Sequence, residues 1–136
     1  MVDTIPLEHV GIRTTAETFE PTIRLYTEVF GWRVIEERPS TGPHDRLAFI
    51  SDGRGGAFEV FVSSRTTGCI EHPAHLAFAV PFDDFPALAE RLNQAGVTLD
   101  PPFINEVGDR IAFFSDPAGN RAQIIGRLKA LPSRTG

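Results

Sequence analysis

The chain has 136 residues, of which 41% are hydrophobic and 23% are charged, and its net charge at pH 7 is −5. This composition is that of an ordinary soluble globular protein. It contains no basic run typical of nucleic-acid binding and no apolar run long enough to cross a bilayer. The N-terminus lacks the pattern of a secretory signal, and the single cysteine, Cys69, cannot form an internal disulfide. We therefore expect a cytoplasmic protein whose partners include neither nucleic acid nor membrane.

The first half of the chain is predicted to contain one helix and four strands. Apolar side chains recur every three to four positions through residues 17–30, which is the spacing of one helical face, and Gly31 follows as a C-terminal cap. Apolar runs predict a strand on each side of this helix, and the turn DGRGG predicts a hairpin after them. The four expected strands cover residues 5–13, 32–37, 46–51 and 57–62.

The second half repeats this order of elements. A helix is expected over residues 83–96, with Asp83 or Asp84 near its N-cap and Gly96 near its C-cap. The turn DPAGN predicts a second hairpin. The expected strands cover residues 74–80, 97–103, 110–115 and 121–126, and prolines interrupt the second of these.

An internal repeat underlies this order. The segments RLAFISDGRGGAFEVF (46–61) and RIAFFSDPAGNRAQII (110–125) align without a gap at an offset of 64, with six of 16 positions identical. His9 and His75 begin the two halves, and the interval from His9 to Gly31 is one residue longer than that from His75 to Gly96. A repeat of this kind predicts an α+β fold of two tandem βαβββ modules forming a cupped eight-stranded mixed sheet around a central cavity. The modules are placed at residues 1–64 and 65–128, followed by a flexible tail at 129–136.

Polar residues interrupt the apolar strands at matching positions of the two halves. These are His9 and Glu59 in the first half, and His75 and Gln123 in the second. A charged or polar side chain inside a strand is costly to bury unless it is paired or binds a metal. Two imidazoles, a carboxylate and an amide oxygen would suit a divalent Zn, Ni, Co, Mn or Fe(II) ion.

Taken singly, each of these residues has an ordinary structural interpretation. A histidine in a strand is often a satisfied core residue. Glu59 could instead form an ion pair with Arg46 or Arg121 across a hairpin. The symmetric placement of all four residues is what favours a shared site.

The motifs LEHVGI, RLYTEVFGWRV, FEVF, HPAHLAFAV and FFSDPAGNRAQI make the resemblance to a known family explicit. Over residues 5–127 the chain resembles the vicinal oxygen chelate superfamily, which includes glyoxalase I, methylmalonyl-CoA epimerase, extradiol dioxygenases, and fosfomycin and bleomycin resistance proteins. The resemblance implies that the metal ligands are His9, Glu59, His75 and Gln123. Glyoxalase I-like members usually have Glu at the position of Gln123, so this chain departs from their pattern.

The resemblance implies a glyoxalase-like isomerase or lyase that depends on a divalent metal ion. Its small-molecule substrate would carry neighbouring oxygens and react through an enediolate or enolate, with Glu59 as the catalytic base. Gly11 and Arg13 share the strand face of His9 and are expected to contact the substrate, with Phe49 and Phe113 as apolar walls. Plain core packing is the alternative role for these two phenylalanines. Members of the family commonly pair, so a homodimer is expected.

Two other functions remain open. His9, His75 and Glu59 could form the two-histidine, one-carboxylate set of an Fe(II) extradiol-type dioxygenase. The 11 phenylalanines could instead line the apolar cleft of a metal-free antibiotic-binding protein of the bleomycin-resistance type.

Overall fold

The computed structural model describes residues 4, 7–40, 45–63 and 74–129. The chain divides into two compact units, Met1–Gly68 and Cys69–Gly136. The expected boundary between residues 64 and 65, Cys69, and the tail beyond Lys129 lie outside the described residues. Within the described part of the chain, no helix has the length and apolar character needed to span a bilayer.

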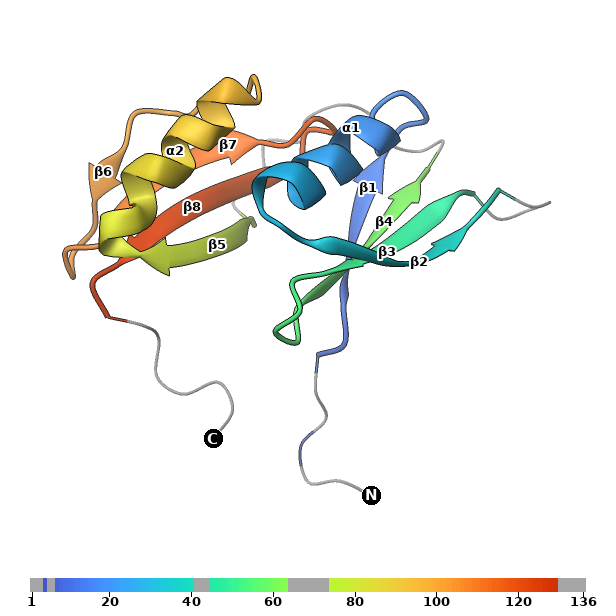
Figure 1. Ribbon diagram of the computed structural model, residues 1–136, viewed down its shortest axis with the longest axis horizontal. Coiled ribbons are helices and arrows are strands. Elements are labelled where there is room, and N and C mark those ends of the chain that lie inside the picture. Colours follow the sequence, from blue (N-terminus) through green and yellow to red (C-terminus); the bar gives the residue numbers. More distant parts are fainter. Residues whose placement is uncertain (1–3, 5–6, 41–44, 64–73, 130–136) are drawn as a thin grey trace. The chain divides into compact units, whose positions relative to one another are not determined.

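The first unit is a βαβββ module (Figure 1). Its strand order is β1-β4-β3-β2, with β1 parallel to β4 and the other pairs antiparallel. Its helix α1 continues directly into a π-helical turn. The elements are β1 (Val10–Thr14), α1 (Phe19–Arg24), the π-helix (Leu25–Val29), β2 (Arg33–Arg38), β3 (Leu47–Ser51) and β4 (Ala57–Val62).

The second unit has the same topology, in the order β5-β8-β7-β6 with β5 parallel to β8. The expected α+β fold of two βαβββ modules is therefore confirmed. The expectation that both sheets join around one cavity concerns how the units meet, and it stays a prediction. The elements are β5 (Leu76–Pro81), a 3₁₀ turn (Phe82–Asp84), α2 (Phe85–Gln94), β6 (Phe103–Ile104), β7 (Arg110–Ser115) and β8 (Arg121–Arg127).

Most strand boundaries lie within one residue of the expected ones, and three strands, β1, β5 and β6, begin later than expected. β1 begins at Val10 and β5 at Leu76, so each histidine lies one residue before its strand instead of inside it. The strand expected at residues 97–103 is reduced to the two-residue β6. Pro101 and Pro102 precede β6, and a proline has no N–H with which to extend the ladder.

One face of each sheet is buried beneath its helix. In the first unit Tyr26 is fully buried, and its ring meets Phe58 of β4 edge-on, with centroids 5.3 Å apart. In the second unit α2 packs so closely on β8 that a Cβ added at Gly126 would lie 3.0 Å from the Cβ of Phe85. Each large apolar side chain buried in this way contributes roughly 1.5–3 kcal/mol. Because side chains alternate along a strand, the residues between the buried ones point to the other face of the sheet.

The two helices differ in length by one residue. The N-caps are Thr18 and Asp84, and the glycines that follow the helices are Gly31 and Gly96. The first segment, from N-cap to glycine, is therefore one residue longer than the second. Both glycines have positive φ values of 76° and 83°, as expected for caps at a helix C-terminus. The extra residue of the first helix coincides with the π-helix Leu25–Val29, because a π-turn holds one more residue than an α-turn.

The two hairpin turns are closed by equivalent aspartates. Oδ1 of Asp52 accepts the backbone N–H groups two and four residues later, at 2.7 and 2.8 Å. Asp116, at the matching position of the second half, accepts the corresponding N–H groups at 3.0 and 2.8 Å. The repeat in the sequence therefore reproduces individual hydrogen bonds.

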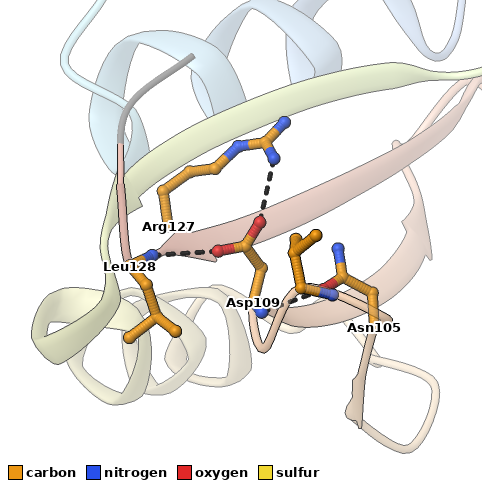
Figure 2. Close-up of polar contacts among 5 residues, drawn as sticks. Asn105, Asp109, Arg127 and Leu128 are labelled. Atoms are coloured by element: carbon orange, nitrogen blue, oxygen red, sulfur yellow. Dashed lines mark hydrogen bonds and ion pairs between the residues drawn. The ribbon is translucent and has the colours of Figure 1, made fainter.

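In the second unit, Asp109 binds Arg127 and Leu128 and so joins the turn before β7 to the end of β8 (Figure 2). Oδ1 of Asp109 accepts the backbone N–H of Leu128 at 2.9 Å, and Oδ2 accepts Nη1 of Arg127 at 2.9 Å. The Leu128 hydrogen bond first, and then Arg127, lower the pKa of the Asp109 carboxyl below its ordinary value. The turn before β7 is thereby tied to the end of β8.

Candidate metal and substrate site

The candidate residues of the first unit lie on the sheet face opposite α1. Glu59 occupies the centre of β4, in register with Gly11 of β1 on one side and Phe49 of β3 on the other. His9 immediately precedes β1 and reaches the same face, since its ring meets Phe49 edge-on with centroids 5.2 Å apart. The structure therefore brings together three of the predicted site residues, His9, Phe49 and Glu59.

His9 is held between two carboxylates. Its Nδ1 lies 2.8 Å from Oε1 of Glu8, and its Nε2 lies 3.8 Å from Oε2 of Glu59. An ionised carboxylate only accepts hydrogen bonds, so Nδ1 carries the proton in this arrangement. In the neutral ring, Nε2 then presents its lone pair toward Glu59. Sequence reasoning did not assign a role to Glu8, although its place beside His9 was visible in the chain.

Arg46 does not pair with Glu59, so that alternative interpretation of Glu59 was wrong. Nη2 of Arg46 lies 2.6 Å from Oε1 of Glu20, and its guanidinium covers the ring of Phe19 at 4.4 Å. Both contacts are with α1, on the other side of the sheet from Glu59. The alternation of strand residues explains this, because Arg46 precedes β3 at an odd separation from Phe49.

Gly11 and Arg13 lie along the same face of β1 as His9. A Cβ added at Gly11 would lie 3.3 Å from the ring of Phe61, so the glycine leaves room for that ring. Arg13 is half-buried and in register with Phe61. These positions agree with the expected strand face, and their contact with a substrate stays a prediction.

The second unit carries the equivalent arrangement with different chemistry. Gln123 lies in register with Ala77 of β5 and Phe113 of β7, and only 7% of it is exposed. The ring of His75 meets Phe113 edge-on, with centroids 5.4 Å apart and an interplanar angle of 85°. The same angle is found between His9 and Phe49. The repeated histidine–phenylalanine pair is thus a feature of both units.

An arginine covers each of the two predicted wall residues. The guanidinium of Arg38 lies 5.4 Å from the ring centre of Phe49 and also pairs with Glu36 at 2.7 Å. Arg121 lies closer to its ring, 4.3 Å from the centre of Phe113. Sequence reasoning considered Arg121 only as a partner for Glu59. Its position two residues before Gln123, on the same strand face, was the signal that could have revealed it.

The donor chemistry of these residues fits a divalent ion. In the first unit an imidazole nitrogen and a carboxylate oxygen converge, and both side chains are about one-third exposed, at 32% and 28%. The second unit offers a further imidazole and an amide oxygen. Among the residues that the structure describes, no group of three or more His, Cys, Asp or Glu side chains forms a complete metal site. The first unit therefore brings together two donor atoms of the kind that such an ion binds.

Comparisons with known proteins agree with this architecture. A model of the Glyoxalase/Bleomycin resistance protein/Dioxygenase superfamily matches residues 7–124. No curated protein matches the chain significantly by sequence.

Several solved structures are similar to this fold. A glyoxalase family protein from Enterococcus faecalis is 24% identical with a TM-score of 0.74, over 88% of this chain and 96% of that one. The fosfomycin resistance protein FosX from Listeria monocytogenes is 15% identical with a TM-score of 0.74, over 91% and 94%. A mutant of glyoxalase I from Zea mays is 28% identical with a TM-score of 0.70, over 90% of this chain but 45% of that longer one.

Proposed function

The chain belongs to the Glyoxalase/Bleomycin resistance protein/Dioxygenase superfamily, and from its residues we propose that it is a metal-dependent isomerase or lyase. Its substrate would be a small molecule with two neighbouring oxygens. The observation that carries this proposal is the convergence of His9 and Glu59, with Nε2 and Oε2 3.8 Å apart. Two lone-pair donors facing each other repel unless a proton or a cation lies between them.

Glu8 acts as a positioning residue in this proposal. Its hydrogen bond to Nδ1 of His9 fixes the ring and leaves Nε2 free to bind a metal ion. Partners of this kind are typical of metal-bound histidines and raise the basicity of the ligating nitrogen.

Four residues would hold the ion: His9, Glu59, His75 and Gln123. Their nitrogen and oxygen donors suit Zn, Ni, Co, Mn or Fe(II). When bound, such an ion polarises a substrate oxygen and stabilises the negative charge that develops during proton removal.

Glu59 is the proposed proton-transferring group. Gln123 cannot act as a base, because an amide has no accessible proton-accepting state near neutral pH. With one base, a proton can be removed and returned at a neighbouring carbon, which is isomerisation. Phe49 and Phe113 would form apolar walls, and Gly11 and Arg13 would line the first unit's side of the substrate.

We also propose that the protein forms a homodimer. β2 is an edge strand whose residues are all exposed, and Val34 and Ile35 are 41% and 57% exposed. An open edge with apolar side chains is usually covered by a partner. Light scattering at micromolar concentration should give twice the 14.9 kDa chain mass, and a clean monomer would contradict the proposal.

Metal binding tests the proposed function most directly. Protein stripped with a chelator should bind about one Mn, Ni, Co or Zn ion per chain by calorimetry and should melt at a higher temperature with the ion. His9→Ala should abolish tight binding, and Glu8→Gln should weaken it about 10–100-fold. Glu17→Gln, an exposed carboxylate before α1, is the matched control.

Three results would redirect the proposal. Failure of every ion to bind or to stabilise the protein would overturn it. Turnover of catechols only by anaerobically loaded Fe(II) protein would favour the dioxygenase. Tight binding of an antibiotic by the metal-free protein, without turnover, would favour a sequestering role.

A further inference from the structure

Arg121 lies at the centre of a polar row on the second unit. It is in register with Ser115 of β7. The parallel pairing of β5 and β8 matches Leu76 with Ala122. His75 directly precedes Leu76 and Arg121 directly precedes Ala122, so these two residues are also neighbours. Because alternate residues share a strand face, this row lies beside Gln123 and opposite α2. Three hydrogen-bonding side chains, from His75, Arg121 and Ser115, therefore occupy neighbouring positions.

No described carboxylate of the second unit forms an ion pair with Arg121. Arg38, Arg46 and Arg127 each form an ion pair with an acidic side chain, at 2.7, 2.6 and 2.9 Å. Arg121 forms none with the described residues of its own unit, and its guanidinium instead stacks on Phe113 at 4.3 Å. Stacking occupies the flat face of a guanidinium and leaves the N–H groups at its edge available.

Because residue 123 is a glutamine and not a glutamate, it does not neutralise the positive charge of Arg121. Residues 121 and 123 are two apart on one strand and share a face, about 7 Å from each other. A glutamate at 123 would reach the guanidinium and neutralise it, whereas glutamine cannot. The first unit has Glu59 at the equivalent position, and there the residue corresponding to Arg121 is Ala57. The carboxylate is thus absent from the unit that carries the exposed arginine.

We propose that Arg121, with Phe113 beneath it and His75 and Ser115 beside it, forms a subsite for an anionic group of the substrate. This inference rests on the proposed function, since the anionic group belongs to the same small molecule. The ligand chemistry is that of a planar or tetrahedral oxyanion, a carboxylate or a phosphoryl group, which binds the edge of a guanidinium through two parallel hydrogen bonds.

The test uses metal-free full-length protein in a chelator at low ionic strength. Acetate and methylphosphonate are titrated separately, and binding is followed by calorimetry and by the NMR signal of the Arg121 side-chain N–H. Wild-type protein should bind one of the two probes, and the tighter one identifies the carboxylate or the phosphoryl source. Arg121→Gln should weaken that binding at least about tenfold, as expected for losing a charge-assisted pair.

Two further variants make the test specific. Gln123→Glu should weaken anion binding to a similar extent with Arg121 intact, because the new carboxylate pairs with it. Arg91→Gln removes the same charge from exposed α2, on the other side of the sheet, and should leave binding unchanged. Equal affinities in wild type and Arg121→Gln, an equal loss in Arg91→Gln, or no binding of either probe would overturn the subsite. Because no metal is present, these outcomes are independent of metal binding by the four proposed ligands, His75 and Gln123 included.

Discussion

In the first unit His9 stands between two carboxylates, Glu8 and Glu59, whereas the equivalent positions of the second unit hold Ala74 and Gln123. The histidine and its edge-on phenylalanine are the same in both units, and a polar residue lies at the centre of the last strand in each. The two units therefore share the same arrangement of site residues but differ in the charges that these residues carry. One unit concentrates negative charge around an imidazole, as a cation requires, and the other carries the cation Arg121, which no described carboxylate of that unit neutralises.

The helices differ in a way that concerns structure alone. The carbonyl of Tyr26 accepts the N–H of Trp32, six residues on, whereas that of Leu92 accepts the N–H of Val97, five residues on. The first helix therefore absorbs its additional residue as a wider turn. Its buried side chains keep their positions, because Tyr26 and Leu92 are both fully buried.

The largest expected effect comes from removing one residue from each helix in turn. Deleting exposed Glu90 from the middle of α2 rotates all later residues by about 100° and takes Leu92 off the core. The loss should be about 2–5 kcal/mol, as for truncating a buried leucine. Deleting exposed Glu28 from the π-helix should cost only about 1 kcal/mol, because the segment can close into an α-turn like that of α2.

Urea unfolding of both deletion variants measures this difference. Equal losses would show that the additional residue of the first helix is required for its packing, and that the two helices are not variants of one element.

The repeat made the fold predictable, and it also predicted which strand residues occupy matching positions in the two units. The gapless alignment of the two hairpins correctly matched Glu59 with Gln123 and Phe49 with Phe113, because both pairs occupy equivalent registers. The unequal intervals between histidine and glycine in the two halves recorded the extra residue, but spacing alone does not distinguish a π-turn from a longer loop.

Side-chain contacts that the repeat does not share were not predicted, although the positions of their residues were visible in the sequence. Arg121 covers Phe113 from the neighbouring strand, and the tie between Glu8 and His9 depends on a rotamer of a residue outside the ladder. The brevity of β6 was only partly foreseen, since prolines mark an interrupted strand without giving its length. How the two half-sites combine was inferred from symmetry and stays a prediction.

A smaller effect, on catalysis, is expected when the central residue of β4 is made the same as that of β8. Glu59→Gln gives both units an amide at this position and removes the proposed base, so turnover should fall at least about 100-fold. The metal should be retained, because the amide keeps a ligating oxygen. Steady-state kinetics on a panel of hemithioacetals, α-hydroxyketones and diols, with metal content measured on each preparation, decides the matter.

The reciprocal variant Gln123→Glu is the matched control and should still bind metal. If metal-loaded Glu59→Gln turns over at a near-normal rate, Glu59 is not the base, and oxygen chemistry or simple binding becomes the better explanation.

The smallest effect, on stability, separates two aspartates that the repeat makes equivalent. Asp109 is 3% exposed and bonded to Leu128 and Arg127, whereas Asp45, its counterpart in the first half, is exposed and forms no ion pair with the described residues. Asp109→Asn should therefore lower the melting temperature by several degrees at pH 7, and Asp45→Asn should leave it nearly unchanged.

The pH dependence of this difference identifies its cause. The pKa of Asp109 is lowered from 3.8 in the folded protein, so near that pH the unfolded chain binds more protons than the folded one. The stability due to Asp109 is then fully present above about pH 4 and is lost as the pH falls through the lowered pKa. Melting curves of wild type and Asp109→Asn should converge in that acidic range, while those of Asp45→Asn follow the wild type throughout. A difference that persists unchanged at low pH would mean that shape, not charge, holds the end of β8 to the turn before β7.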